Sequence, residues 1–294
     1  MAKQNEKICI FTDSAADITR AEAERWKIDI VPLRVIVDGK TYLEYYDITP
    51  EEYWKMLEES KDFPQTSQVG MDSFLNLYKK AKAEGCTHVI GVLINSKGSG
   101  TYQAACITRD MFYDEYGKDM VIELIDSLCY SYTYGKVAVT GAKMREEGKS
   151  FAEILAEMTS LSKGMKAYVG IYNLRILRKS GRISGGAAFV GDALGLRPVA
   201  VVFNGAVDVM CKVRGDKAVA NKLVELAVRD AVDREHQTAY IAHGDVPEAQ
   251  IAALERKLLE AGFAAVKRGP LGVMVTSNTG PQALGVIFRG APRP

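Results

Sequence analysis

Apolar runs of strand length alternate along this chain with amphipathic segments of helical length. The apolar runs lie at 8–11, 29–37, 88–94, 120–125, 167–171 and 239–242. The amphipathic segments lie at 18–26, 50–59, 71–84, 101–116, 131–147 and 151–161. This alternation predicts βαβ units, and therefore an α/β protein with a parallel sheet and flanking helices. Right-handed crossovers would gather the loops that follow the strands along one rim, where α/β sheets bind ligands.

The second half of the chain has a different pattern. Residues 172–198 are rich in Gly and Arg, and residues 199–214 predict a hairpin because Asn204-Gly205 separates two β-branched runs. Helices are expected at 216–234 and 246–261, and two further strands at 273–276 and 285–288. We therefore expect two domains, 1–164 and 165–294.

The bulk composition is that of an ordinary globular protein. The chain has 294 residues, 47% hydrophobic and 26% charged, which suits two domains of about 150 residues each. Its 38 basic and 37 acidic side chains leave a net charge of +1, so charge gives no general attraction to nucleic acid or an anionic membrane. No apolar run is long enough to cross a bilayer, and the first residues lack the apolar region of a signal peptide. We expect a soluble cytoplasmic protein with no integral membrane segment.

Five cysteines are scattered along the chain without a C-x-x-C pair. An odd number without paired spacing argues against a disulfide framework and against a zinc site. We therefore expect reduced thiols that mostly serve as small buried apolar side chains, and neither a metal nor a cofactor. No Ser/His/Asp order, H-E-x-x-H motif or carboxylate pair stands out, so an enzyme that works alone has little support.

The segment 95–103 follows an expected strand and opens an expected helix. Gly98 and Gly100 allow the backbone to approach a ligand closely, and Ser96, Ser99 and Thr101 add hydroxyls. A strand, a Gly/Ser loop and a helix start together form a general cradle for a small anion. The G-K-[ST] of a nucleotide-binding P-loop is absent. The alternative is a flexible strand-to-helix turn.

Two other polar segments stand at expected element ends. Asp13 and Ser14 follow the first strand, and would be either polar anchors at a site or part of a turn before a helix capped by Asp17. Thr66 and Ser67 precede the helix at 71–84, where they could hold an anion together with free N–H groups of the first turn. The alternative for this second segment, 63–68, is an ordinary capping loop.

A local basic patch lies at 175–182, where four basic residues, including Arg178 and Arg182, crowd into eight positions. It could face a phosphate or an acidic partner protein, or it could be a solvated helix end. Residues 276–281 read as a polar turn after a strand. Among the three histidines only His243, at a strand end, suggests a site, and we expect a structural role even there.

Taken in order, these segments resemble the DegV family of bacterial fatty-acid-binding proteins. Each motif alone is weak, whereas the ordered set is specific and spans nearly the whole chain, from about Ile8 to Phe288. The motifs are Thr12-Asp13-Ser14, Val31-Pro32-Leu33, Asp47-Ile48-Thr49, Thr66-Ser67-Gln68, Ser99-Gly100-Thr101-Tyr102-Gln103, Gly181-Arg182-Ile183-Ser184 and Thr279-Gly280-Pro281.

The resemblance implies a two-domain α/β fold, with a parallel sheet in the first domain, a mixed sheet in the second and a fatty acid buried between them. It implies that hydroxyls at Thr66 and Ser99, with nearby backbone amides, hold the carboxylate. Some family members present the acyl chain to a separate kinase, which phosphorylates the carboxylate, and they have no catalytic activity of their own. In those members the segment around Arg182 and a histidine before Thr-Gly-Pro matter for the kinase step.

Two positions depart from the family pattern. The family's histidine is Asn278 here, and an amide can donate a hydrogen bond but cannot become cationic near neutral pH. The family's hydrophobic residue before Ser-Gly-Thr is Gly98, and its paired serines are Asn95-Ser96. We therefore expect a carrier for a long-chain fatty acid whose service to a kinase is open.

The alternative from another class is an enzyme or binding protein for a small phosphorylated or carboxylated metabolite. It would use Asp13 as a base and the loop from Gly98 to Thr101 as a cradle. Pocket shape separates the two hypotheses, because a long apolar tunnel favours the carrier and a short polar cavity favours the enzyme.

Overall fold

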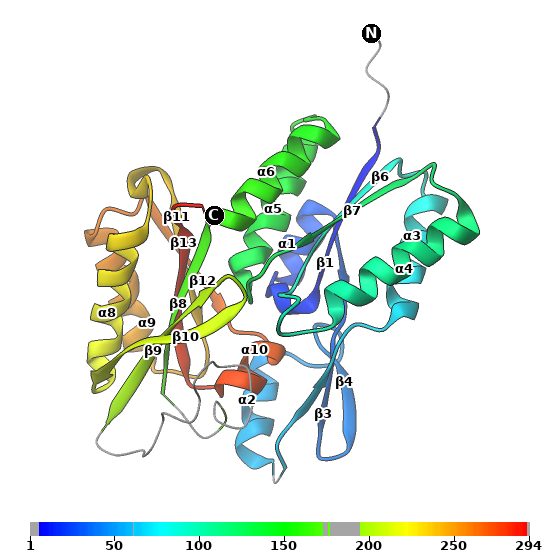
Figure 1. Cartoon of the computed structure of the whole chain (residues 1–294). Helices are drawn as coiled ribbons and strands as arrows, with labels where there is room; N and C mark the ends of the chain where they lie inside the picture. Colours follow the sequence, from blue (N-terminus) through cyan, green and yellow to red (C-terminus); the bar gives the residue numbers. More distant parts are fainter. Residues whose placement is uncertain (1–5, 61, 173–175, 177–194, 293–294) are drawn as a thin grey trace.

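The computed structural model describes residues 6–60, 62–172, 176 and 195–292, which form three sheets surrounded by helices (Figure 1). The first half of the chain holds a four-stranded sheet in the order β2-β1-β6-β7, with every neighbouring pair parallel. Its strands are β1 Ile8–Asp13, β2 Ile28–Val31, β6 His88–Leu93 and β7 Val121–Asp126. The predicted parallel sheet and the α/β class are confirmed.

Helices cover both faces of this sheet (Figure 1). One face carries α3 (Met71–Ala83) and α4 (Thr101–Tyr116), and the other carries α1 (Arg20–Trp26), α5 (Tyr132–Glu146) and α6 (Phe151–Gly164). Each lies within a few residues of its predicted range. The N-cap of α1 is Thr19, so the prediction of Asp17 as that cap is wrong. Asp17 instead ends the short 3-10 helix η1 (Ser14–Ala16) in the left-handed region, with φ 52°.

The apolar run 29–37 is two strands in different sheets, although one strand was expected. Pro32, which has no N–H to donate to a sheet ladder, separates β2 from β3 (Arg34–Val37). Strand β3 is the centre of an antiparallel sheet with β4 (Lys40–Leu43) and β5 (Gln65–Ser67). This small sheet fixes Thr66, which lies opposite Val35. Helix α2 (Pro50–Glu59) follows β4 in the chain and begins at the capping box of Thr49 and Glu52.

The second half of the chain forms a mixed six-stranded sheet in the order β10-β9-β8-β13-β11-β12. Only β11 and β12 pair in parallel. Its strands are β8 Met165–Ile171, β9 Leu196–Phe203, β10 Ala206–Arg214, β11 Thr238–His243, β12 Ala265–Pro270 and β13 Ala283–Arg289. The predicted hairpin is confirmed, and its turn residues Asn204 and Gly205 both have positive φ, 49° and 79°.

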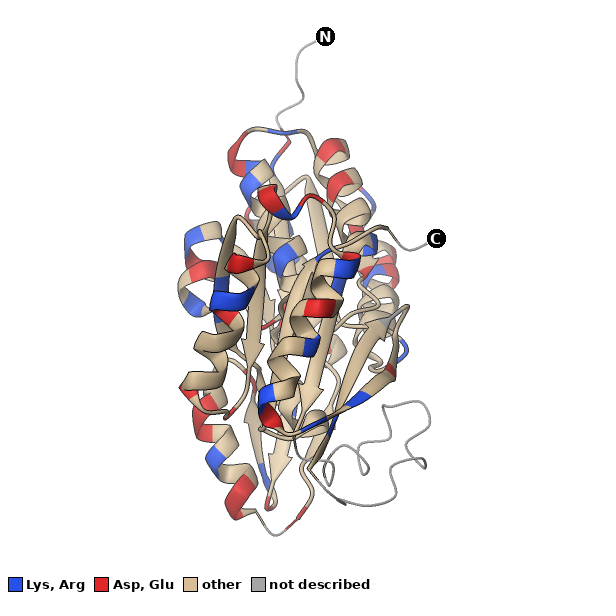
Figure 2. Cartoon of the chain, turned by 90° about the vertical axis from the view of Figure 1, so that its left-hand side faces the viewer, with Lys and Arg blue, Asp and Glu red and all other residues tan. Residues whose placement is uncertain are grey.

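The outer face of the six-stranded sheet is covered by α8 (Asp216–Asp230) and α9 (Glu248–Glu260), with the short 3-10 helix η3 (Arg234–His236) between them. Figure 2 shows basic and acidic residues interspersed along the helices on this side. No helix in the described part of the chain combines the length and the apolar surface needed to span a bilayer. We propose the domain boundary between α6 and β8, at 164/165.

Residues 273–276, predicted as a strand, instead begin helix α10 (Val273–Thr279). The polar side chains of this helix form hydrogen bonds to its own backbone and to its N-cap residue. Thr276, Ser277 and Asn278 each donate to the carbonyl four residues earlier. The apolar side chains Val273 and Met274 are buried in a core cluster that also contains residues of the first half of the chain. Tertiary burial therefore overrides the strand preference of a β-branched sequence.

Cys9 and Cys86 form a disulfide, so the expectation of reduced thiols is wrong for this pair. Cys9 lies in β1 and Cys86 just before β6, and these strands are parallel neighbours. The Cα atoms lie 6.3 Å apart, within the range that a disulfide spans. The two cysteines are 77 residues apart in the sequence, and no local pattern indicates that they meet. Their contact arises from the pairing of strands that are distant in sequence. Cys106, Cys129 and Cys211 are not part of a disulfide.

Candidate functional site

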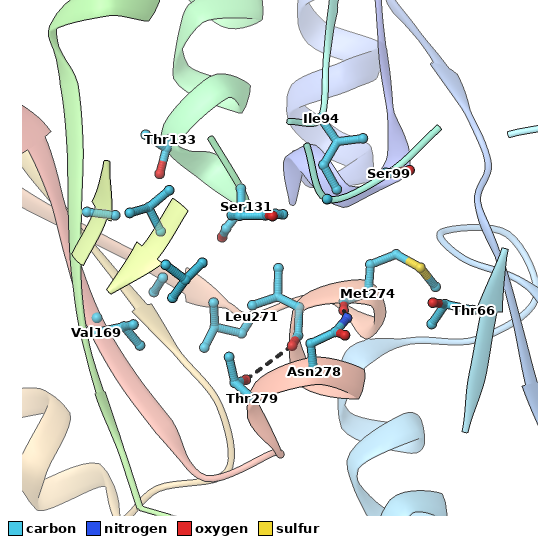
Figure 3. A pocket seen from close by; sticks show the side chains of 18 of the residues that line it. Thr66, Ile94, Ser99, Ser131, Thr133, Val169, Leu271, Met274, Asn278 and Thr279 are labelled. Carbon is cyan, nitrogen blue, oxygen red and sulfur yellow. Dashed lines mark hydrogen bonds between the residues drawn. The ribbon is translucent and has the colours of Figure 1, made fainter. Parts of the chain in front are cut away.

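A cavity of about 450 Å³ lies between the first half of the chain and the six-stranded sheet (Figure 3). Its wall is largely aliphatic and draws on both halves, together with α10. The aliphatic lining residues are Leu33, Ile94, Ala167, Val169, Ile171, Val202, Val207, Ala242, Leu271, Met274, Val275 and Ile287. Such a wall can take an apolar molecule, with orientation set by a few polar groups.

One end of the cavity brings together two of the predicted polar segments. Thr66, Ser67 and Gln68 come from β5 and the residue after it, and Ser99 and its flanking glycines come from the loop between β6 and α4. Figure 3 shows Thr66 and Ser99 on the same side of the cavity. Thr66 and Ser99 are half-buried, whereas Ser67 is exposed. The hydroxyls of Thr66 and Ser99 can therefore both donate to an anion at this end.

Thr101 does not line the cavity but ties the two segments together. It is fully buried, and its Oγ1 lies 2.9 Å from Ser99 Oγ and accepts a hydrogen bond from Val69 N at 3.3 Å. The Thr101 N–H in turn donates to Ser99 Oγ at 3.3 Å. Thr101 therefore positions Ser99 against the segment that carries Thr66.

Gly98 and Gly100 leave no room for side chains at this loop. A Cβ at Gly98 would collide with the hydroxyl of Tyr130, and one at Gly100 would collide with the amide of Gln68. Both glycines line the cavity. Asn95 holds the Tyr130 hydroxyl in place beside Gly98, whereas the exposed end of Gln68 can move away from a side chain at position 100. Bare backbone is therefore required more strictly at Gly98 than at Gly100.

Asn95 fastens this loop to the six-stranded sheet. Its side chain is fully buried, and its Nδ2 donates to Tyr130 Oη at 2.7 Å and to the carbonyl of Gly205 at 2.8 Å. Lys97 Nζ donates to the carbonyl of Asn204 at 2.8 Å. The turn of the β9–β10 hairpin is therefore held against the loop, although hairpin and loop are about one hundred residues apart in sequence.

Asp13 and Ser14 lie behind the wall of the cavity and are not among its lining residues. Asp13 is fully buried and accepts hydrogen bonds from Tyr134 Oη at 2.6 Å and from Ile94 N at 2.7 Å. Ser14 Oγ accepts from Leu33 N at 2.9 Å. Because Ile94 and Leu33 do line the cavity, the two predicted anchors hold its wall in place.

A buried carboxylate joins Ser14 to α10. Glu44 accepts from Ser14 Oγ at 2.6 Å and from Met274 N at 2.9 Å. Burial raises the pKa of Glu44 to about 7 and the pKa of Asp13 to about 6, while hydrogen bonds to their oxygens act in the opposite direction. Burial also raises the pKa of Asp17, which accepts a hydrogen bond from Ser131. None of these three acids lines the cavity.

The remaining predicted residues are more dispersed. Ser96 is exposed and does not line the cavity, and its N–H donates to Asp126 at 3.1 Å. Asn278 lines the cavity from α10 and donates to the carbonyl of Met274 at 2.7 Å. Arg178 and Arg182 lie outside the described residues. His243 does not line the cavity, and its ring packs against Trp54 with the ring centroids 6.3 Å apart.

The sequence reasoning missed the loop that follows β7. Tyr130, Ser131 and Thr133 line the cavity from this loop and from the start of α5. Leu128 and Ser131 have left-handed φ values of 51° and 59°, a conformation that costs energy outside glycine and recurs at binding sites. The available signal was positional, since this loop follows a parallel strand on the same rim as the loop after β6.

The described residues contain one group that could hold a metal ion, formed by Cys9, Glu84 and Cys86. Both sulfurs of this group are joined in the disulfide, which removes the thiolates that a soft metal would need. None of these three residues lines the aliphatic cavity. The cavity itself offers hydroxyl, amide and backbone groups.

Comparison with known proteins gives one family. The DegV family of uncharacterised proteins matches residues 7–290. A DegV domain-containing protein of Clostridium acetobutylicum is 33% identical over 285 residues, covering 96% of this chain and 98% of that protein. A solved DegV family protein from Thermus thermophilus, described as binding fatty acid, has a TM-score of 0.87 at 29% identity and covers 97% of this chain and 100% of its own. A DegV lipid-binding protein from Thermotoga maritima has a TM-score of 0.84 at 28% identity, covering 98% and 100% respectively.

Proposed function

The chain belongs to the DegV family, and we propose that it binds one long-chain fatty acid in the aliphatic cavity. The carboxylate would lie at the end formed by Thr66 and Ser99, and the acyl chain would run toward the six-stranded sheet. The observation that carries this proposal is the shape of the site, which is an aliphatic cavity of about 450 Å³ with the hydroxyls of Thr66 and Ser99 together at one end. The relative from Thermus thermophilus, described as binding fatty acid, supports it.

The polar end suits a carboxylate better than a more highly charged group. A carboxylate removed from water needs several hydrogen-bond donors, and hydroxyl and N–H donors supply them. The described residues that line the cavity offer hydroxyl, amide and backbone donors and include no Lys or Arg, a set that supports a carboxylate. Thr66 and Ser99 are the donors we assign to the carboxylate, with Gln68 and the bare backbone at Gly100 beside them.

The aliphatic wall supplies the larger share of the binding energy. Each buried methylene contributes about 0.8 kcal/mol, so a sixteen-carbon chain gains on the order of 10 kcal/mol before the costs of association. Tight binding is then possible even though the neutral donors at the polar end contribute modestly.

The positions of the buried acids support a carrier role without independent catalysis. An enzyme acting on a small metabolite would need its base within hydrogen-bond reach of the substrate. Asp13, the base of that alternative, is buried behind the wall and accepts hydrogen bonds from Tyr134 and Ile94. We therefore favour the carrier over the enzyme.

We also propose that the protein presents its fatty acid to a separate kinase only weakly, because Asn278 replaces the histidine that the family resemblance assigns to the kinase step. Asn278, at the family's histidine position, lies on the cavity wall and would stand near the bound lipid. The cytoplasmic location expected from the sequence stays a prediction.

Native mass spectrometry tests the binding proposal. The purified chain should retain a fatty acid, and after delipidation it should take up one palmitate or oleate per chain. A delipidated chain that takes up neither lipid would contradict the proposal. Decanoate, whose shorter chain covers less of the aliphatic wall, serves as the control ligand and should bind more weakly.

A further inference from the structure

Thr133 carries a buried hydroxyl for which the described structure offers no hydrogen-bond partner. The residue lies in the first turn of α5, lines the cavity and is 1% exposed. In Figure 3 its oxygen points toward the lining side chains, on the opposite side of the cavity from Thr66. The hydroxyl therefore stands along the stretch assigned to the acyl chain, away from the carboxylate end.

Helical threonines in this chain usually donate to the carbonyl four residues earlier. Thr108, Thr140, Thr276 and Thr279 all do so, at 2.8 to 3.1 Å. For Thr133 that carbonyl belongs to Cys129, and it already accepts from Asn95 N at 3.1 Å and from Ser127 Oγ at 3.3 Å. Residue 129 also lies two positions before the N-cap of α5, so its carbonyl is not the helical acceptor that the other four threonines use.

The lining residues that the six-stranded sheet supplies here are aliphatic apart from Tyr168, whose hydroxyl already donates to Asp230. The lining residues from β8, β9 and β10 include Ala167, Val169, Ile171, Val202 and Val207. A purely aliphatic chain against this part of the wall leaves the hydroxyl unpaired, which lowers its affinity relative to a ligand that pairs with the hydroxyl.

We propose that the cavity selects a hydroxylated long-chain fatty acid, whose chain hydroxyl pairs with Thr133 Oγ1. This inference rests on the proposed function and names the ligand class within it. A hydroxyl can both donate and accept, and so can Thr133, so the pair forms without a fixed proton arrangement. A cis double bond offers neither a donor nor a conventional acceptor. Sites that hydrogen-bond a ligand hydroxyl discriminate against analogues that lack it.

Calorimetric competition with stearate and a series of monohydroxystearates tests this assignment on the delipidated full-length chain. The series places the hydroxyl at successive positions of the distal half of the chain. We expect one or two positions to bind about tenfold more tightly than stearate in the wild type. In Thr133→Val, which keeps the shape and removes the hydroxyl, that preference should disappear while stearate binds at least as well as before.

Two further variants separate the hydroxyl from general effects on the helix. Thr133→Ser keeps a hydroxyl and should keep the preference, and Thr140→Val, on the same helix but outside the cavity, should leave it unchanged. Equal hydroxystearate-to-stearate ratios in the wild type and Thr133→Val at every position would overturn this inference and leave the proposed function intact. A wild type that binds neither stearate nor any hydroxystearate would overturn the proposed function as well.

Discussion

The hydroxyl oxygens of Ser99 and Thr101 lie 2.9 Å apart, with Ser99 facing the cavity and Thr101 buried behind it. Thr101 also accepts from Val69 N, two residues beyond Ser67. The pair therefore connects the two segments that hold the proposed carboxylate. It explains how a loop rich in glycine can present one hydroxyl in a fixed place.

Replacement of Ser99 should weaken fatty acid binding specifically. A hydrogen bond to a charged group contributes about 1.5–3 kcal/mol, so Ser99→Ala should lower palmitate affinity by roughly tenfold to a hundredfold. Ser96→Ala is the matched control, because Ser96 is exposed and outside the cavity. The palmitate affinity of this variant should equal that of the wild type. Calorimetric titration with palmitate measures both. Equal losses in the two variants would argue against the carboxylate clamp.

Loss of the Asn95 side chain should destabilise the fold and loosen the cavity together. Asn95→Ala leaves Tyr130 Oη and the carbonyl of Gly205 without a buried donor, which should lower the free energy of unfolding by about 2 kcal/mol. Lys97→Ala removes an exposed contact to the same hairpin turn and should change the free energy of unfolding by less than about 0.5 kcal/mol. Urea unfolding measures the free energy of unfolding of both variants. Similar losses in the two would mean that the buried Asn95 amide is not the main contact that holds the hairpin turn.

Stability should fall as the pH rises from about 4 to about 7. Asp13 and Glu44 ionise near pH 4 when unfolded, but burial raises their folded pKa values to about 6 and about 7. Within that window the folded protein binds protons that the unfolded chain has lost, so the free energy of unfolding decreases with pH. Above the folded pKa values this contribution levels off.

Glu44→Gln should flatten this pH dependence. The amide keeps an acceptor for Met274 N and no longer needs to ionise, which should recover on the order of 3 kcal/mol at pH 8 relative to pH 4. Glu58→Gln, an exposed substitution on α2, should reproduce the wild-type curve. The measurement is urea unfolding at a series of pH values, and a Glu44→Gln curve parallel to that of the wild type would contradict the assignment.

Asn278 should limit any service to a fatty acid kinase. We expect the palmitate-loaded wild type to yield little acyl phosphate with a DegV-linked kinase and ATP. Asn278→His should raise the rate by about a hundredfold if the imidazole assists proton transfer, and Asn278→Ala should not. Hydroxamate trapping measures the product. A wild type as active as Asn278→His would show that the histidine is dispensable here.

Much of the first half could be predicted from the sequence. Its strands and helices show in the local hydrophobic periodicity, and their alternation favours a parallel sheet. The meeting of the segments around Thr66 and Ser99 came from the order of family motifs, since the two lie on different sheets. Asn204-Gly205 was sufficient for the hairpin because its positive φ values suit a tight turn.

The missed features depend on tertiary contacts. Helix α10 has a β-branched sequence and is helical because its apolar side chains are buried and its polar ones bond within the helix. The Cys9–Cys86 bond and the unpaired hydroxyl of Thr133 both depend on neighbours distant in sequence or on a loop of unusual backbone conformation. No local pattern encodes such contacts.

A crystal structure of the delipidated chain reloaded with palmitate would show where the carboxylate and the acyl chain bind. We predict density for one acyl chain in the aliphatic cavity, with the carboxylate oxygens within hydrogen-bond distance of Thr66 Oγ1 and Ser99 Oγ and the tail against β8 and β9. An empty cavity at saturating palmitate, or a carboxylate bound at the opposite end beside Thr133, would contradict it.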